Sequence, residues 1–330
     1  MRLRSNLIFI IGLLVSAVFL WLALRNVDAQ RTLAALGSAN YMWAIPLLVC
    51  LAGFCITKAW RWALLLGIPV SRGMNGLVRS VLVGYAGTSL LPLQLGELVR
   101  AWAATRALRI PAAPVLVSIA LERVLDLFAV LVVLSGVLFL GGPLPEGLLR
   151  AGWAFAGAAV VLLAFLLLYV MRTELVLAFA ARATAFLPQQ LHAKLQEQLR
   201  KGAAGAHALR NPGLWVWLAV SSLAQWGFMA ACIATSGAAL GLQLPYAASA
   251  SVLGLTIIGM SLPSGPGYVG SIQLAFALGL APFGIGASEA IAASVFYHVL
   301  VCGSLIAAGV AALYRLGGSF QTLREPTGPG

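Results

Sequence analysis

Residues 80–126 read SVLVGYAGTSLLPLQLGELVRAWAATRALRIPAAPVLVSIALERVLD. This stretch lies in an otherwise strongly apolar chain, yet it combines charged side chains with a proline and a glycine that interrupt its helical pattern. Charge inside a bilayer is costly and usually marks a functional site. Interrupted helix at that depth is tolerated only inside protein or beside a wet cavity. The stretch therefore predicts a polar cavity within the membrane, built from Pro92, Gly96, Glu97, Arg100, Glu122, Arg123 and Asp126.

The composition is that of a membrane protein. Of 330 residues, 61% are hydrophobic and only 9% are charged, whereas about a quarter of the residues in a soluble domain carry charge. Several apolar runs reach the ~20 residues that cross a bilayer. We therefore predict an all-α polytopic membrane protein. The net charge of +12 fits basic cytoplasmic loops and anionic lipid headgroups, so we expect a lipid partner and no nucleic acid.

Recognisable catalytic and nucleotide-binding motifs are missing from the sequence. It has no phosphate-binding loop, nucleophile elbow or dinucleotide fingerprint. Its four cysteines lie in apolar runs without metal-like spacing, and its three histidines are scattered. We predict no cofactor, no metal and no catalytic residue.

About six full spans are expected, at residues 7–24, 41–66, 111–140, 151–171, 214–240 and 287–313. Basic residues before the first span and after the last place both termini in the cytoplasm of a bacterial-type inner membrane. Lys58 and Arg61 are expected to extend from the end of the second span to the interface. Residues 172–210 suit an amphipathic helix on the cytoplasmic surface, although a solvated linker fits equally well.

The chain also contains an internal repeat. Residues 80–96 and 251–267 align without gaps, with six identities among seventeen positions. Basic loops flank the first copy and nearly uncharged loops flank the second, so the two copies enter the membrane from opposite sides. We predict one transmembrane domain over residues 1–330, with inverted repeats at about 67–171 and 213–316. Two inverted re-entrant helical hairpins of this kind place a substrate site at the midplane.

The charges of the first repeat allow two interpretations. Glu97 and Arg100 are spaced to pair on one helix, and Glu122, Arg123 and Asp126 are expected to point as one cluster. They form either an ion-pair network that only joins two helices, or a headgroup site in which arginines bind an anion. We favour the second, because neutral contacts join helices more cheaply in lipid.

The second repeat supplies the other candidate residues. Gly96 and Gly267 are expected to open half-helices whose N-termini favour phosphate, although such breaks also serve simply to turn a chain. His298 falls opposite Arg123 and could relay protons, but a lone histidine is more often a packing residue. The substrate-binding candidates here are Ser264, Gly265, Pro266, Gly267, Tyr268, Gly270, Gln273 and His298.

These motifs resemble the flippase-like transmembrane domain of lysylphosphatidylglycerol synthases over about residues 7–316. The resemblance rests on LLPLQLGELVRAWAATRAL, ERVLD, LPSGPGYVGSIQLAFAL and YHVL. It implies lipid translocation or lipid handling, without the aminoacyl-transfer domain of the full-length synthases. Two positions depart from the family pattern: Gln273 stands where a glutamate is frequent, and His298 where an arginine is frequent.

The leading hypothesis is a lipid flippase that moves a phospholipid or a lipid-linked headgroup through a polar midplane cavity between two inverted hairpins. One alternative is a membrane enzyme that acts on a lipid-linked substrate, with Glu97, Glu122 and His298 as acid–base groups. Another is a non-transporting partner of an envelope-synthesis complex. Whether the protein forms a homo-oligomer stays open.

Overall fold

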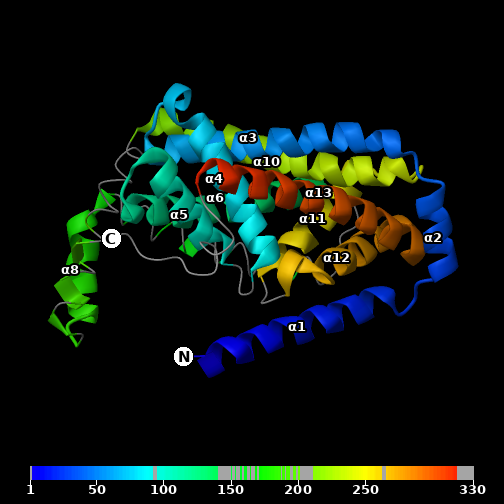
Figure 1. Ribbon diagram of the computed structural model, residues 1–330, viewed down its shortest axis with the longest axis horizontal. Helices are drawn as coiled ribbons and strands as arrows, with labels where there is room; N and C mark the ends of the chain where they lie inside the picture. The colour runs from blue at the N-terminus through cyan, green and yellow to red at the C-terminus, as the bar shows by residue number, and fades with distance from the viewer. Residues whose placement is uncertain are drawn as a thin grey trace.

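The computed structural model describes residues 2–91, 95–139, 171–186, 211–261 and 265–317, together with scattered positions from 150 to 200. Within these residues every regular element is a helix (Figure 1), as the all-α prediction requires. The helices are α1 (Arg2–Leu24), α2 (Ala29–Gly37), η1 (Tyr41–Trp43), α3 (Ala44–Leu66), α4 (Val70–Leu90), α5 (Gly96–Leu108), α6 (Ala112–Phe139), α8 (Thr173–Ala183), α10 (Pro212–Ala239), α11 (Tyr246–Ser261), η4 (Pro266–Tyr268), α12 (Ser271–Leu280), η5 (Ala281–Phe283) and α13 (Ala287–Arg315).

Local signals explain several of the helix ends. Asp28 caps α2, because its carboxylate accepts hydrogen bonds from the backbone N–H groups of Gln30 and Arg31. Asn211 caps α10 in the same way, with Pro212 in its first turn. Gly67 ends α3 in the left-handed conformation at φ 65°, which glycine adopts without steric cost.

Three of the described helices are long and apolar enough to cross a membrane: Tyr41–Leu66, Gly213–Ala239 and Ala287–Arg315. Gly12–Leu24 and Ala29–Gly37 together are also long and apolar enough to span, but they meet at a bend of 85°. Helix α6 has 28 residues and is long enough to span, although it carries three charges in its middle. Six full spans therefore stay a prediction, and the predicted span at residues 151–171 lies largely outside the described residues.

The helices form an elongated bundle (Figure 1). Helices α3 and α10 run side by side along their length, α5 folds back on α4, and α13 packs across α4. Helix α12 folds back on α11 in a second hairpin. The predicted domain bounds and inverted repeats stay predictions, and most of residues 184–210 in the predicted linker lie outside the described residues.

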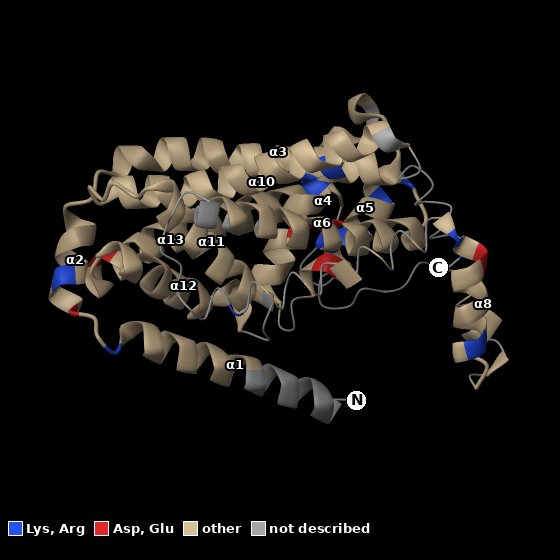
Figure 2. Ribbon diagram, turned by 180° about the vertical axis from the view of Figure 1, so that it is seen from behind, with Lys and Arg blue, Asp and Glu red and all other residues tan. Residues whose placement is uncertain are grey.

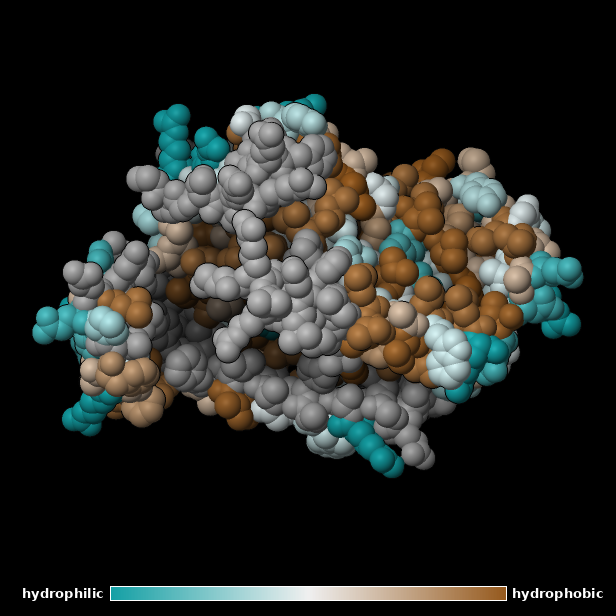
Figure 3. Space-filling model, turned by 60° about the horizontal axis from the view of Figure 1, so that its bottom comes forward, coloured by the Kyte–Doolittle hydropathy of each residue, from teal (hydrophilic) through white to brown (hydrophobic). Residues whose placement is uncertain are grey.

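The outside of the bundle is apolar. Large hydrophobic side chains stand exposed on several helices, among them Val49, Val216 and Val299, each more than 60% exposed. Hydrophobic residues cover much of the visible face in Figure 3. Exposed apolar patches of this extent mark a surface that contacts lipid or other protein, whereas most of the charges described next are buried.

Candidate functional site

Glu122 is the centre of a buried ion-pair network. Helix α6 holds it with Asp126 one turn further on, and the two residues are only 1% and 6% exposed. One carboxylate oxygen of Glu122 accepts hydrogen bonds from Lys58 Nζ and, at 3.0 Å, from Arg61 Nη2. Its other oxygen lies 2.7 Å from Arg100 Nη2. Two helices, α3 and α5, therefore direct three cations at one carboxylate.

Lys58 and Arg61 on α3 do not extend to the interface, so that prediction is wrong. Their residues are 5% and 0% exposed. Arg61 Nη2 lies 2.6 Å from Asp126 Oδ1, and Nη1 donates to Ser222 Oγ at 3.0 Å. On α10, the amide of Gln225 lies 3.5 Å from Asp126 Oδ1. A signal for this arrangement was present: two cations one turn apart on one helix match two carboxylates one turn apart on another.

Arg100 is held on the far side of Glu122. Its guanidinium lies 3.8 Å from the centre of the Trp62 ring, and Trp62 donates to Ser118 Oγ at 2.8 Å. Arg100 Nη1 lies 3.4 Å from Glu97 Oε2, so the predicted pair between these two residues is present. The Arg100 side chain is only 3% exposed, which leaves little of its surface for a headgroup.

Arg123 is the accessible member of the network. Its side chain is 59% exposed, and its Nη2 is hydrogen-bonded to Oε1 of Glu97, which is 31% exposed. The ion-pair partner of Arg123 is Glu97, although Arg123 also lies close enough to Glu122 and Asp126 for electrostatic interaction with both. That the three residues act as one cluster stays a prediction. Glu97 links Arg123 to the buried charges through Arg100.

The network carries one surplus positive charge. Four cations, Lys58, Arg61, Arg100 and Arg123, face three carboxylates, Glu97, Glu122 and Asp126. Burying charges is expensive, and leaving one unpaired is more so. Since the cations around Glu122 and Asp126 are enclosed, the positive charge that an external anion can reach lies on Arg123. Figure 2 shows several basic and acidic segments of ribbon close together near α3, α4, α5 and α6.

Small residues let the first hairpin close tightly over this network. Helix α4 ends at Leu90, and α5 begins at Gly96. A Cβ on Gly96 would overlap the Thr88 hydroxyl and the Gly84 carbonyl oxygen, and a Cβ on Gly84 would lie 2.7 Å from Arg100 Cβ. These glycines therefore permit the backbone contact that brings Arg100 to Glu122. Pro92, the predicted break, lies outside the described residues.

The second hairpin turns differently from the expectation. Gly267 does not open a half-helix but sits inside η4 at φ 70°. Helix α12 begins at Ser271 after Gly270, whose φ is 90° and whose N–H donates to Gln273 Oε1 at 2.7 Å. The backbone N–H of Gly265 donates to Ser16 Oγ on α1 at 2.8 Å. Ser264 lies outside the described residues.

The turn of the second hairpin at η4 lies beside the C-terminal end of α4. Element η4, which contains Pro266, packs against α4. A Cβ built on Gly267 would lie 3.9 Å from the Ser89 carbonyl oxygen and 4.0 Å from His298 Nε2. Tyr268 lies close enough to Arg123 and Glu97 for electrostatic interaction with both. The structure therefore brings the exposed ion pair of the first repeat to the turn of the second.

Gln273 and His298 form a second side-chain pair. Gln273 Nε2 lies 3.2 Å from His298 Nδ1, across a separation of 25 residues. The Glu97–Arg123 pair spans 26 residues. In each case a side chain in the first turn of a short helix contacts the long helix that follows. The two pairs thus occupy corresponding places in the predicted repeats, one charged and one neutral.

Comparison with known families identifies the chain at this point. The sequence matches the family described as the lysylphosphatidylglycerol synthase TM region over residues 9–309. The chain belongs to this family. No curated protein matches it, and no solved structure does. Family membership and the apolar helices long enough to cross a bilayer make the chain a multi-pass membrane protein with a lipid-related function.

Within the lysylphosphatidylglycerol synthase TM family, the resemblance places a glutamate and an arginine where this chain has Gln273 and His298. These two departures contact one another. In this chain a hydrogen-bonded glutamine–histidine pair therefore occupies both positions. The glutamine oxygen still accepts from the Gly270 N–H, as a glutamate oxygen would.

Proposed function

We propose that this protein moves a phospholipid, or a lipid-linked polar headgroup, across the cytoplasmic membrane. One observation carries the proposal. Arg123 carries the accessible positive charge of the network, is 59% exposed, and lies close enough to Tyr268 in the turn of the second hairpin for electrostatic interaction. A guanidinium presents paired donors that match the oxygens of a phosphate. Its position suits a lipid phosphate that passes between the hairpins while the chains remain in the bilayer.

Glu97 acts in this proposal as the resident counter-ion. It pairs with Arg123 when no lipid is bound, so the arginine is not left unpaired in a region of low polarity. An arriving phosphate replaces the carboxylate on Arg123, and Glu97 retains its contact with Arg100. When the headgroup leaves, the ion pair between Glu97 and Arg123 forms again. Because the Glu97 carboxylate and the lipid phosphate compete for Arg123 with similar affinity, the lipid binds weakly enough to be released.

The buried part of the network serves as a support. Glu122 and Asp126 each form an ion pair with at least one cation. This pairing favours a role for the two carboxylates in positioning the cations over a role in acid–base chemistry. The protein is therefore proposed as a transporter and not as an enzyme. Movement of one hairpin against the other exposes the site to each leaflet in turn, either downhill or coupled to an ion gradient.

Reconstitution in proteoliposomes tests the proposal. Headgroup-labelled phosphatidylglycerol and phosphatidylcholine report translocation when a membrane-impermeant quencher is added outside. We expect wild type to move at least one of them, and Arg123→Gln to slow it about tenfold or more, because a hydrogen bond to a charged group contributes roughly 1.5–3 kcal/mol. Arg109→Gln is the matched control, since Arg109 is an exposed arginine at the end of α5.

Two results would count against the proposal. One is equal translocation by wild type and Arg123→Gln. The other is conversion of the lipid to a new product, detected by mass spectrometry, which would favour a membrane enzyme. Both variants are checked by size-exclusion chromatography, so a loss of activity is compared only between folded proteins.

A further inference from the structure

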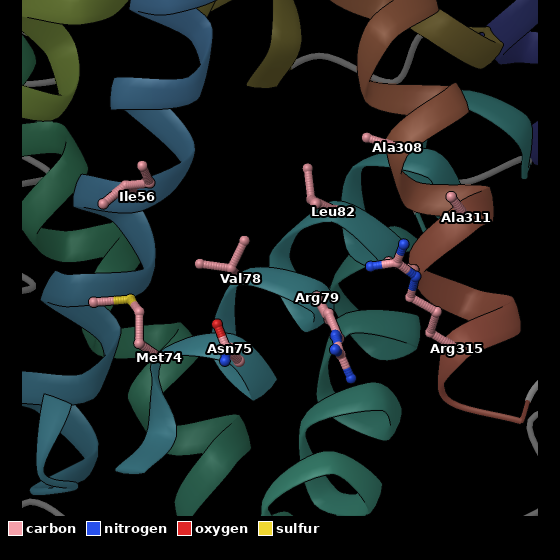
Figure 4. Close-up of a pocket in the computed structure, with 10 residues that line it drawn as sticks. Ile56, Met74, Asn75, Val78, Arg79, Leu82, Ala308, Ala311 and Arg315 are labelled. Atoms are coloured by element: carbon pink, nitrogen blue, oxygen red, sulfur yellow. The ribbon is translucent and has the colours of Figure 1, made fainter. Parts of the chain in front are cut away.

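A pocket of about 610 Å³ lies between α3, α4 and α13, away from the charge network (Figure 4). Pockets of ~300–1,000 Å³ accommodate small ligands. Two of its walls, α3 and α13, belong to helices that are long and apolar enough to span a membrane. The residues that line it are Ile56, Met74, Asn75, Val78, Arg79, Leu82, Ala308, Ala311, Ala312 and Arg315.

The lining is amphipathic in a way that matches a phospholipid. Most of it is aliphatic, and its three polar members are Asn75, Arg79 and Arg315. In Figure 4 Arg315 extends from α13 toward α4, while Asn75 and Arg79 project from α4 between the two outer helices. No carboxylate lines the pocket. Ile56, which lines the pocket on α3, is 52% exposed.

The two arginines are available for an anion. Neither Arg79 nor Arg315 forms an ion pair with an acidic side chain in the part of the chain that the structure describes. Arg61, Arg100 and Arg123, in contrast, each pair with a carboxylate. Arg315 is the last residue of α13, where a spanning helix reaches the headgroup layer. Basic residues near that layer attract anionic lipid.

We propose that this pocket binds one anionic phospholipid. An acyl chain lies along Ile56, Val78, Leu82 and Ala308, and the phosphate is held by Arg79 and Arg315 with the amide of Asn75. The site is separate from the proposed transport site at Arg123. Occupancy by a bound lipid does not require translocation, so the two proposals can fail independently.

Photo-crosslinking tests the site directly. Wild type is reconstituted in nanodiscs that contain phosphatidylglycerol or phosphatidylcholine with a diazirine in one acyl chain. After illumination, labelled peptides are mapped by mass spectrometry. We expect the phosphatidylglycerol probe to label the segments around residues 74–82 and 308–315 in preference to the phosphatidylcholine probe. Arg79→Gln and Arg315→Gln should each lower that preference about fivefold, since one basic residue near an anionic surface contributes a factor of this order.

Matched controls separate this site from general lipid contact. Arg109→Gln removes an exposed arginine outside the pocket and should leave labelling unchanged. Ala308→Leu narrows the pocket and should lower labelling, whereas Ala307→Leu adds the same bulk at an exposed neighbour on α13 and should not. Labelling is compared only between variants that elute as a single peak in size-exclusion chromatography, as wild type does.

Three results would overturn the proposal. Equal labelling by both lipids, unaffected by the arginine variants, would mean ordinary surrounding lipid. Competition by free glycerol phosphate would mean that the pocket recognises an anion and not a lipid. Absence of labelling, restored when residues 318–330 are removed or when a dimer is dissociated, would mean that the chain's own terminus or a second copy occupies the pocket.

Discussion

Arg123 on α6 donates a hydrogen bond to Glu97 on α5, and this pair is the exposed end of a charge network whose other members are enclosed. Its neutral counterpart, Gln273 with His298, joins the corresponding helices of the second hairpin. If the two predicted repeats derive from one ancestral site, the first repeat has kept the anion-binding arginine, Arg123, and the second repeat has lost it. The account therefore assigns unequal roles to the two hairpins.

The network should tolerate little loss of negative charge. Glu122→Gln leaves Lys58, Arg61 and Arg100 facing one carboxylate fewer, and removal of one partner from a buried ion pair costs roughly 3–5 kcal/mol. We predict a lower thermal unfolding midpoint for the detergent-solubilised protein. Adding Lys58→Met to Glu122→Gln removes the cation whose ion-pair partner was Glu122 and should recover part of the loss.

The control for that experiment is Glu174→Gln, because Glu174 lies exposed on α8 and should leave the midpoint near wild type. An unchanged midpoint in Glu122→Gln would show that the network contributes nothing to stability.

Gly96 should be irreplaceable for packing reasons. The added methyl of Gly96→Ala overlaps Thr88 and the Gly84 carbonyl, and overpacking of this kind costs about 1–3 kcal/mol. Gly303→Ala is the control, since a Cβ there meets nothing within 4 Å on α13. It should stabilise slightly, because alanine favours a helix over glycine. Chemical denaturation in micelles measures both, and equal effects would contradict the close packing of α4 on α5.

Substitution of both Gln273 and His298 should replace their neutral hydrogen-bonded pair with an ion pair. Gln273→Glu keeps the acceptor for the Gly270 N–H but loses the amide that contacts His298. His298→Arg alone adds a cation without a counter-ion. Each single variant should therefore be less stable than wild type, and the double variant should recover. A double-mutant cycle on the free energy of unfolding should give a coupling of about 0.5–3 kcal/mol; additive effects would argue against the contact.

The sequence predicts the end of α4 and the start of α5 at Gly96, but not the turn of the second hairpin or the direction of every side chain. The chain break after α4, the Glu97–Arg100 pair and the shared face of Glu122 and Asp126 all follow from proline, glycine and helical spacing. The predicted direction of Lys58 and Arg61 is wrong, because the sequence pattern of a cation near the end of an apolar run is the same whether its side chain extends to the interface or turns inward.

Which way such a side chain turns depends on the neighbouring helix. Only the approach of α6 and α10 provides Lys58 and Arg61 with Glu122, Asp126 and Ser222. The outward direction of Arg123 has the same origin, since Glu97 reaches it from α5. The apolar periodicity of one helix does not predict which residues of a distant helix its side chains contact.

The central claim is that Arg123 binds the headgroup and does not merely join α5 to α6. Arg123→Gln and Glu97→Gln break the same pair, but only the first removes the cation. The decisive measurement is translocation rate in proteoliposomes as a function of the mole fraction of the transported lipid. We predict that Arg123→Gln abolishes saturable translocation, whereas Glu97→Gln retains it and saturates at a lower lipid fraction. Equal loss in both variants would contradict the account and leave the pair with a purely structural role.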